Sequence, residues 1–351
     1  MMNYPWVHLV GGGAASLSLA IALAKYERLP GDVVITDPKA SYHNDRTFGF
    51  WFRPEEARIF QPEYSLASWS FGSHQENITH YGSRYRYGVR SSQSLYDAAF
   101  EKIDAHPQIQ FQRGTVLDKP KACHVFDSRP PSIENFYVTQ AFSGLEIRCS
   151  KAHGVQTVGL MEAIECLDCG VRFRYLLPLD EYRLLIEHTV FSARQADLVT
   201  LHKLNCLWRE ENWPASEVIR HESASIPMGL CEPMQHFGIP IGARGGMTRP
   251  ATGYGYRNMS IWAIHAARLL VEKDRAAGYR SPQIHEWMDR LFLNLIRYRP
   301  QEIPEVLLAL ARRLNGDRFA QFMMRGNLVD AFRTIIASPK RPFFCALMNL
   351  K

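Results

Sequence analysis

One acidic residue stands in an otherwise apolar segment and could act as a proton donor. The run RLLIEHTVF at 183–191 is rich in apolar and β-branched residues and predicts a β-strand. Because side chains alternate along a strand, Glu187 shares a face with Leu185 and Phe191, whereas His188 lies on the other face. Burial there would raise the pKa of the carboxyl group, and a carboxyl protonated near neutral pH can act as a general acid. The same pattern also suits a carboxylate on a wet face or one paired with an arginine.

A glycine-rich turn near the start of the chain has the spacing of a dinucleotide-binding fingerprint. Residues 7–10 are apolar, Gly11, Gly13 and Ser16 fit the pattern G-x-G-x-x-small, and residues 17–24 are rich in alanine and leucine. In such a strand–turn–helix unit the first glycine permits the turn and the second admits a pyrophosphate. The third small residue keeps the helix close to the strand. The helix N-terminus then offers free N–H groups to the pyrophosphate.

Two aspartates follow predicted strands and are candidate cofactor ligands. Asp37 ends the apolar run 33–36, about 20 residues after the glycines, where an acid binds the ribose hydroxyls of a dinucleotide. Asp127 ends the short run 124–126, where it could bind the ribityl chain of a flavin. A local turn stabilised by the aspartate and the following prolines explains Asp127 equally well.

A second glycine-rich loop, at 242–255, precedes a predicted helix at 258–274. A second helix N-terminus of this kind is a second place to hold an anion. Two such turns far apart in the sequence suit the long FAD molecule, whereas a plain flexible loop is the competing interpretation. The residues of this loop that we expect to contact the cofactor are Gly245, Gly246, Thr252 and Gly253.

Composition excludes several classes of protein. The chain has 351 residues, of which 46% are hydrophobic and 22% charged, as in an ordinary globular protein with a large core. No apolar run is long enough to span a membrane, and the start of the chain does not resemble a signal peptide, so we expect a cytoplasmic location. The net charge of +6 is too diffuse to indicate nucleic-acid binding. Much of it lies in the last third, where arginines among apolar residues suit either an anionic membrane surface or a solvated helical face.

Other types of reactive site find little support. Cys166 and Cys169 form a single C-x-x-C pair, and a zinc site needs about four ligands, so we expect no metal. His153 and His188 could act as bases, but isolated histidines are more often structural. No Ser/His/Asp arrangement is apparent.

The order of the segments predicts an α/β (α+β) chain. A Rossmann-like FAD-binding domain begins at 1–135, and three runs at 144–149, 171–177 and 183–191 suggest an antiparallel substrate domain inserted at 136–230. Residues 231–280 return to the FAD-binding domain, and 281–351 form a helical tail that could touch a membrane. Seven apolar residues could supply the membrane-facing surface of that tail, unless the tail is a lid packed on the core. These are Leu291, Phe292, Leu295, Ile296, Phe319, Phe322 and Met323.

The ordered set of motifs resembles the bacterial lycopene β-cyclases, FAD-dependent enzymes that cyclise carotenoids. The matching runs, besides the first glycine turn, are RTFGFW (46–51), DSRP (127–130), QAFSGLE (140–146), LLIEHT (184–189), PATGY (250–254) and parts of the tail at 325–327 and 339–344. The likeness spans the whole chain, and its specificity lies in the order of the motifs.

This resemblance implies that the protein closes the ends of lycopene, or of a similar acyclic polyene, into β-ionone rings. The family reaction has no net redox change but requires reduced FAD, for which NAD(P)H can supply electrons. A protein acid protonates the terminal double bond, and the reduced flavin is thought to stabilise the resulting carbocation. The family's essential acid matches Glu187. Because carotenoids partition into bilayers, the resemblance also implies peripheral association with the inner face of the membrane.

The chain departs from the family pattern at three places near these motifs. His188 follows the essential glutamate where an acid is usual, Arg249 stands where histidine is common, and residues 47–50 read TFGF instead of TWSF. Two other classes of function therefore compete with a lycopene cyclase. One is a flavin-dependent monooxygenase or reductase acting on an apolar substrate. The other is a non-catalytic FAD- or lipid-binding protein, which would need the glycines but not Glu187.

Overall fold

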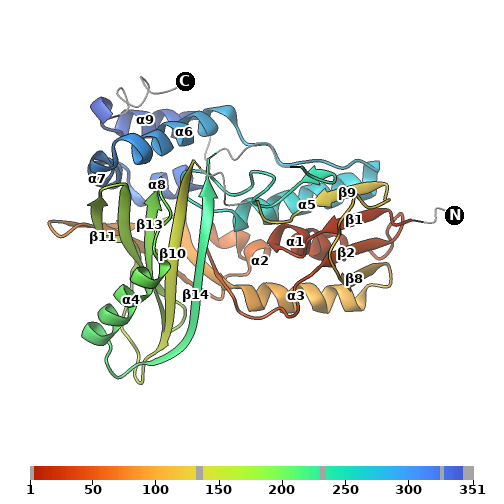
Figure 1. The fold of residues 1–351 in the computed structure, drawn as a ribbon, viewed down its shortest axis with the longest axis horizontal. Coiled ribbons are helices and arrows are strands. Elements are labelled where there is room, and N and C mark those ends of the chain that lie inside the picture. Colours follow the sequence, from red (N-terminus) through yellow and green to blue (C-terminus); the bar gives the residue numbers. More distant parts are fainter. Residues whose placement is uncertain (1–3, 132–136, 230–234, 325–327, 343–351) are drawn as a thin grey trace.

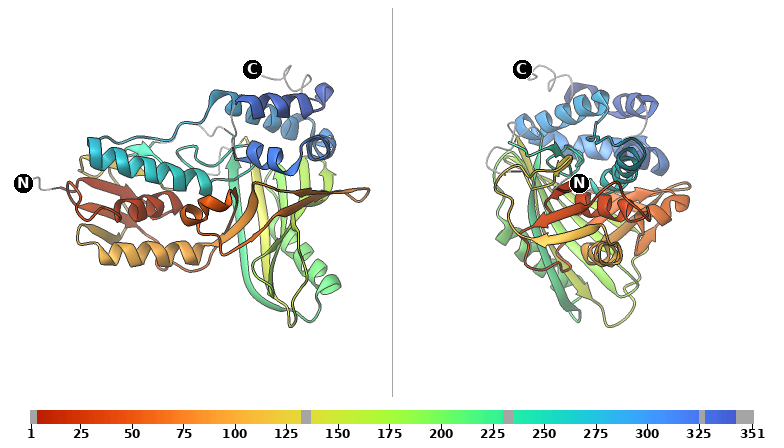
Figure 2. Two further views of the ribbon diagram at one scale, coloured as in Figure 1. Left: turned by 180° about the vertical axis from the view of Figure 1, so that it is seen from behind. Right: turned by 90° about the vertical axis from the view of Figure 1, so that its right-hand side faces the viewer.

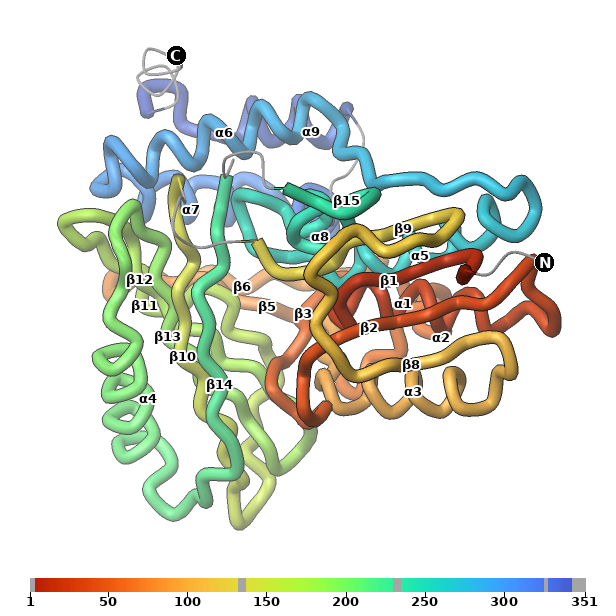
Figure 3. The backbone as a smooth tube through the Cα atoms, turned by 45° about the vertical axis from the view of Figure 1, so that its right-hand side comes forward, coloured from red at the N-terminus to blue at the C-terminus, as the bar shows by residue number. Residues whose placement is uncertain are grey.

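A five-stranded parallel sheet forms one end of the molecule (Figure 1). The computed structural model describes residues 4–131, 137–229, 235–324 and 328–342. The strand order is β15-β9-β1-β2-β8, and all four pairings are parallel. The bounds are β1 Val7–Val10, β2 Val33–Asp37, β8 Ile109–Arg113, β9 His124–Asp127 and β15 Ile239–Pro240. Figure 3 shows β9, β1, β2 and β8 side by side in this order.

Helices cover this sheet and explain the sequence pattern of the first unit. Helix α1 (Ala14–Leu23) is apolar around its whole circumference and almost entirely buried, as expected for a helix enclosed by its neighbours. It packs against α5 (Tyr256–Lys273) and α3 (Ser92–Ala105). The predicted strand–turn–helix unit is therefore confirmed. The helix predicted at 258–274 is also present, as α5, and it begins two residues earlier than predicted.

A seven-stranded sheet forms the second half, with the order β14-β10-β13-β12-β11-β5-β6. Its bounds are β5 Ser68–Gly72, β6 Asn77–Tyr81, β10 Val138–Arg148, β11 Val158–Leu167, β12 Gly170–Pro178, β13 Arg183–Ser192 and β14 Glu217–Met228. All pairings are antiparallel except the one between β5 and β11. The three predicted antiparallel strands are confirmed. The segment before residue 135 also contributes β5 and β6, while the predicted domain boundaries at 135/136 and 230/231 lie outside the described residues.

A small three-stranded sheet joins the two halves in the order β3-β7-β4. Its bounds are β3 Thr47–Phe52, β4 Tyr64–Leu66 and β7 Arg86–Ser91, and the short helix α2 (Ala57–Phe60) follows β3. The run RTFGFW therefore supplies all of β3 except its last residue, Phe52, and Phe50, Trp51 and Phe52 are buried.

The C-terminal segment is helical wherever it is described. Helices α6 (Gln283–Tyr298), α7 (Ile303–Arg313), α8 (Gly316–Met323) and α9 (Leu328–Ala337) lie over one end of the large sheet (Figures 1 and 2). Helix α4 (Leu198–Asn212) packs against β10 and β13. It covers the opposite face of that sheet, because Leu184 and Ile186 pack with α4 whereas Leu185 packs in the core beneath α6–α8. The tail motif residues 325–327 and 343–344 lie outside the described part.

Candidate functional site

The first glycine turn has the geometry that a pyrophosphate requires. Gly11 has a φ of +94°, in the left-handed region that favours glycine. Gly13 is the N-cap of α1 and, without a side chain, provides no capping hydrogen bond. The first turn of α1 contains no acidic residue. A Cβ atom at Gly13 would have no protein atom closer than Ser128 O at 3.8 Å. The free N–H groups of α1 therefore face open space, as an anion site needs.

Ser16 and Asp37 lie where the sequence predicts them and bond to neighbouring turns. The Ser16 hydroxyl donates to Ser128 Oγ at 2.8 Å, which ties α1 to the loop after β9. Asp37 ends β2, and its carboxylate accepts a hydrogen bond from the backbone N–H of Gly12 at 2.6 Å. Asp37 is thus beside the glycine turn, as the dinucleotide motif requires.

Asp127 ends β9, the strand next to β1, and is fully buried. Its carboxylate accepts hydrogen bonds from the Arg129 guanidinium at 2.7 and 2.9 Å and from the backbone N–H of Phe237 at 3.1 Å. Burial raises the pKa of Asp127, but the bonds from Arg129 and Phe237 outweigh burial and leave the pKa below its usual value. Asp127 therefore carries a permanent charge at the edge of the predicted cofactor site.

The second glycine loop reaches the same edge of the parallel sheet. It follows β15 and leads into α5. The N-cap residue of α5 is Gly255, which provides no side-chain hydrogen bond to the helix N-terminus. Gly246 and Gly253 have φ values of +69° and +72°, and a Cβ atom at Gly245 would lie 2.4 Å from Pro240 O. Since β1 and β15 run in the same direction, α1 and α5 begin at the same edge and present two uncapped N-termini there. These residues fit an extended dinucleotide such as FAD.

Glu187 is buried on the predicted face of β13. The pairing register places it opposite Gly144 on β10 and Tyr175 on β12. Its Oε1 accepts a hydrogen bond from Thr189 at 2.8 Å. The neighbouring His188 points the other way and bonds to Asn205 of α4 at 2.7 Å. The predicted alternation of side chains is therefore confirmed.

The surroundings of Glu187 favour its protonated form. Burial, the larger cause, and the charge of Glu222 together raise the pKa of Glu187 to about 8, and only the hydrogen bond from Thr189 acts in the opposite direction. A carboxyl group in this state can deliver a proton at neutral pH. No arginine bonds to Glu187 within the described parts of the chain, so the alternative of an ion-paired or wet carboxylate is not what the structure shows.

Three buried tyrosines lie close enough to Glu187 to be affected by its charge, and one tryptophan packs against two of them. The hydroxyls of Tyr87 and Tyr254 lie 3.1 Å apart, and burial raises the pKa of these two and of Tyr175, with the charge of Glu187 adding to the effect. Trp51 contacts Tyr87 and Tyr254 at ring-centroid distances of 4.9 and 5.2 Å. Nothing in the sequence marks these four as site residues, since they come from four separate segments and no spacing links them.

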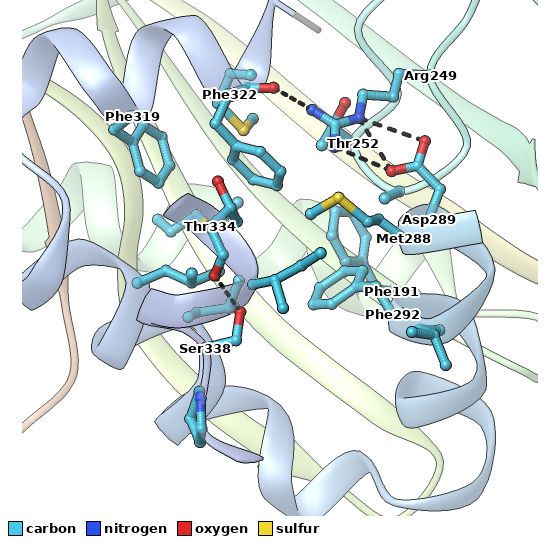
Figure 4. A pocket seen from close by; sticks show the side chains of 18 of the residues that line it. Phe191, Arg249, Thr252, Met288, Asp289, Phe292, Phe319, Phe322, Thr334 and Ser338 are labelled. Atoms are coloured by element: carbon cyan, nitrogen blue, oxygen red, sulfur yellow. Dashed lines mark hydrogen bonds and ion pairs between the residues drawn. The ribbon is translucent and has the colours of Figure 1, made fainter. Parts of the chain in front are cut away.

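A cavity of about 320 Å³ lies between the large sheet and helices α6–α9 (Figure 4). Apolar and aromatic side chains form most of its wall, among them Phe191, Phe292 and Phe319. Phe191 stands four residues after Glu187 on the same face of β13, which places their Cα atoms about 13 Å apart. Thr252 of the second glycine loop also lines the cavity. The cavity thus extends from the helical layer towards the strand that carries the acid and the loop predicted to hold the cofactor.

A buried ion pair connects that loop to the helical layer. Arg249 is 1% exposed and bonds to Asp289 of α6, with N–O distances of 3.0 Å. Its Nη1 donates to the carbonyl oxygen of Phe322 at 2.5 Å, and the guanidinium lies over the Phe322 ring (Figure 4). The arginine that replaces the family's usual histidine therefore joins the loop to α6 and α8.

The residues expected to face a membrane are not on the surface. Leu291, Leu295, Ile296, Phe319 and Met323 are buried, and Phe292 and Phe322 pack against the same core as partly buried side chains. The prediction of a membrane-facing surface on these residues is wrong, because α6 and α8 use their apolar sides to cover the large sheet. Within the described residues, the exposed large hydrophobic side chains of the helical layer are instead Trp287, Tyr298, Leu328, Val329, Phe332 and Ile336.

Two solved structures share this fold. A geranylgeranyl bacteriochlorophyll reductase-like protein from Thermoplasma acidophilum superposes with a TM-score of 0.60 at 12% identity, over 97% of each chain. The flavin-dependent brominase Bmp2 superposes with a TM-score of 0.56 at 12% identity, over 95% of this chain and 94% of the brominase. The predicted Rossmann-like FAD-binding fold is confirmed at this level.

Sequence comparison identifies the family. A lycopene β-cyclase from Paracoccus sp. (strain N81106) is 33% identical over 124 residues, which cover 33% of this chain and 32% of that protein. The aligned part is therefore about a third of the relative's length. The family model described as lycopene cyclase protein matches residues 7–347, nearly the whole chain. The chain belongs to the lycopene cyclase family.

Proposed function

We propose that this protein is a lycopene β-cyclase that uses Glu187 as the general acid. The single observation that carries this proposal is a buried carboxyl group with a raised pKa on the face of β13 that leads to Phe191 in the wall of the apolar cavity. Protonating an alkene requires an acid that is neutral beforehand and shielded from water. The apolar cavity wall suits a hydrocarbon chain, which offers no group for polar recognition.

The proposed reaction moves protons but transfers no electrons to the product. The Glu187 carboxyl gives its proton to the terminal double bond of the polyene, and the resulting cation is attacked by the next double bond to close a six-membered ring. Loss of one proton from the ring then gives the β-ionone end, so one proton enters and one leaves. The faces of Trp51, Tyr87 and Tyr254 stabilise positive charge during these steps.

FAD is the proposed cofactor and NAD(P)H the proposed source of its electrons. When bound and reduced, FAD supplies negative charge that stabilises the cationic end of the substrate. Gly11, Gly13 and the N-terminus of α1 would hold the pyrophosphate, Asp37 the ribose, and the loop with Gly245, Gly246, Thr252 and Gly253 the flavin end. The role of Asp127 at the ribityl chain stays part of this proposal.

The proposal is tested by supplying lycopene. Cells that accumulate lycopene should form cyclic carotenoids when they express the chain, and the purified protein with reduced FAD in D₂O should place deuterium in each ring at the carbon that Glu187 protonates. A monooxygenase or reductase would instead consume NAD(P)H in proportion to product. Unchanged lycopene in both experiments, with folded and flavin-loaded protein, would overturn the proposed activity.

We further propose that the protein binds a membrane surface through the outer face of α9. Leu328, Val329, Phe332 and Ile336 are exposed on this helix at 53–70%, and Arg333 is exposed among them. Apolar side chains flanked by basic groups suit insertion between anionic lipid headgroups. No helix within the described residues is long and apolar enough to span a bilayer.

Replacing Phe332 and Ile336 together with glutamate should weaken binding to anionic liposomes by at least about tenfold, because each of these side chains gains about 1.5–3 kcal/mol on full burial. Co-sedimentation measures the effect. The matched control is the double change Val199→Glu and Leu207→Glu on α4, where both side chains are exposed on the opposite face of the large sheet. Equal losses in both double variants, or none in either, would contradict the assignment to α9.

A further inference from the structure

A second buried carboxyl group faces Glu187 across a glycine. The register aligns Glu222 of β14 with Gly144 of β10, and Gly144 with Glu187 of β13 (Figure 1 shows the three strands). The two glutamates thus lie in one row, two strand spacings or about 10 Å apart between backbones. A Cβ atom at Gly144 would lie 2.9 Å from Cγ of Glu222. The Glu222 side chain therefore extends over β10, into the space that a side chain at position 144 would occupy.

The negative charge of this pair belongs on Glu222. Its Oε2 accepts hydrogen bonds from Arg220 Nη1 at 2.5 Å and from the Thr47 hydroxyl at 3.1 Å. Glu187 has only Thr189 as a donor. Burial raises the pKa of both carboxyl groups, and at Glu222 the bonds from Arg220 and Thr47 offset only part of this, so that its pKa also stays above the usual value. When two carboxyl groups are coupled, the one with more hydrogen-bond donors and a cation beside it ionises first, and the other keeps the proton.

Arg220 cannot do the same for Glu187, because it lies one row further along the sheet. The register pairs Arg220 with Glu146, and the guanidinium also bonds to Glu146 at 2.9 Å. Glu222 thus lies between the cation and Glu187. The other titratable groups that face Glu187 are Tyr175 on β12, Tyr87 on β7 and Tyr254 before α5, and burial keeps all three neutral.

We propose that Glu222, held ionised by Arg220 and Thr47, is a positioning residue that keeps the proton on Glu187 across Gly144. This inference rests on the proposed role of Glu187 as the acid and adds a second carboxyl group to it. Glu222 itself touches no substrate in this scheme. Its charge sets the pH range in which Glu187 stays loaded with a proton.

The test is the titration of Glu187 without substrate. Infrared spectroscopy detects the carbonyl stretch of a protonated carboxyl group, and the band lost in Glu187→Gln assigns it. In the flavin-loaded protein the band should disappear as the pH rises through about 8. In Glu222→Gln the loss of the repelling charge should move this midpoint to lower pH by about one pH unit or more. The alkaline limb of the cyclisation rate should move with it, while the rate at low pH changes much less.

Two further variants keep the test decisive. Glu222→Gln leaves Arg220 with Glu146 as its remaining carboxylate partner and could destabilise the fold, whereas Arg220→Met with Glu222→Gln removes both charges of the pair together. This double variant should show a shift in the same direction. Glu165→Gln is the matched control, since it removes a carboxylate that pairs with Arg172 and acts on His188, on the other face of the sheet. Its Glu187 midpoint should match the wild type.

An unchanged or raised midpoint in the Glu222 variants would overturn the inference, as would an equal shift in Glu165→Gln. Because the titration needs no substrate, it separates this inference from the proposed activity. A shifted midpoint in a protein that leaves lycopene unchanged would contradict the activity alone. Ring formation with an unshifted midpoint would contradict the role of Glu222 alone.

Discussion

Glu187→Gln is expected to abolish ring formation while FAD content stays at the wild-type level. The amide keeps the size of the side chain and can still accept the hydrogen bond from Thr189, but it has no acidic proton to give. Loss of a general acid typically costs about 10²–10⁴-fold in rate. Pigment analysis in lycopene-producing cells measures the loss, and flavin absorbance of the purified variant shows that the cofactor site is intact.

Two neighbouring substitutions serve as controls for this result. Glu187→Asp should be slower than the wild type, because its carboxyl group retreats by one methylene from the buried position. His188→Ala should have a milder effect, since His188 points to α4 and loses only its bond to Asn205. A Glu187→Gln enzyme that still forms rings, beside an inactive His188→Ala enzyme, would show that the two faces of β13 have been assigned the wrong roles.

The pH profile of the wild-type enzyme should carry the signature of this acid. Because the acid that we propose must carry its proton, the rate should be high below the pKa of Glu187 and fall as the pH rises through about 8. An unburied glutamate would lose its proton near pH 4.5 and leave the enzyme inactive at neutral pH. Rates measured from pH 6 to about 10 on flavin-loaded protein check this expectation. A rate that rises steadily across this range would exclude an acid of this pKa.

Gly13→Leu should produce a folded protein that has lost its FAD. Gly13 has a φ of −75°, which any residue can adopt, and a Cβ atom there meets no protein atom within 3.8 Å. The substitution therefore leaves the backbone unstrained and places a bulky side chain where the pyrophosphate must approach the N-terminus of α1. Binding should weaken at least about tenfold, equivalent to about 1.4 kcal/mol. Flavin absorbance per mole of purified protein and thermal unfolding measure the two parts of this prediction.

Gly13→Ala is the graded control, because its single methyl group intrudes less and should retain part of the cofactor. Gly11→Ala makes a useful contrast: at φ +94°, with Ser128 Oγ 2.8 Å from the new Cβ atom, it should lower stability as well as FAD binding. Full flavin content in Gly13→Leu would show that the cofactor does not use this turn.

The parts of the site that could be predicted depend on local sequence. The turn with Gly11 and Gly13 follows from short-range sterics, since a left-handed φ and an open helix N-terminus leave few alternatives to glycine. The face on which Glu187 lies follows from the alternation of side chains along one strand. The tail was correctly predicted as helical from its composition, because helix formation is also a local property.

The remaining features depend on contacts between distant segments. Glu222 faces Glu187 only because β10 lies between β13 and β14 in the folded sheet. No spacing in the sequence encodes the register of these strands. The three tyrosines near Glu187 come from β7, β12 and the loop before α5 in the same way. The apolar periodicity of α6 and α8 predicts that one face of each helix is buried. It does not distinguish burial in lipid from burial against the protein's own sheet.

The position of helix α9 bears on the route by which a water-insoluble compound enters the cavity. Thr334 and Ile335 of α9, with Ser338 just after it, line the cavity, whereas Phe332 and Ile336 are exposed, so a single helix separates the cavity from the surface that we propose to contact the membrane. A hydrocarbon that passes this wall from a bilayer never has to dissolve in water. The turnover rate would then depend on the density of polyene in the lipid. Enzyme and substrate would meet by diffusion in the two dimensions of the membrane plane. Diluting the substrate with inert lipid should slow the enzyme even when the total concentrations of both reactants stay constant.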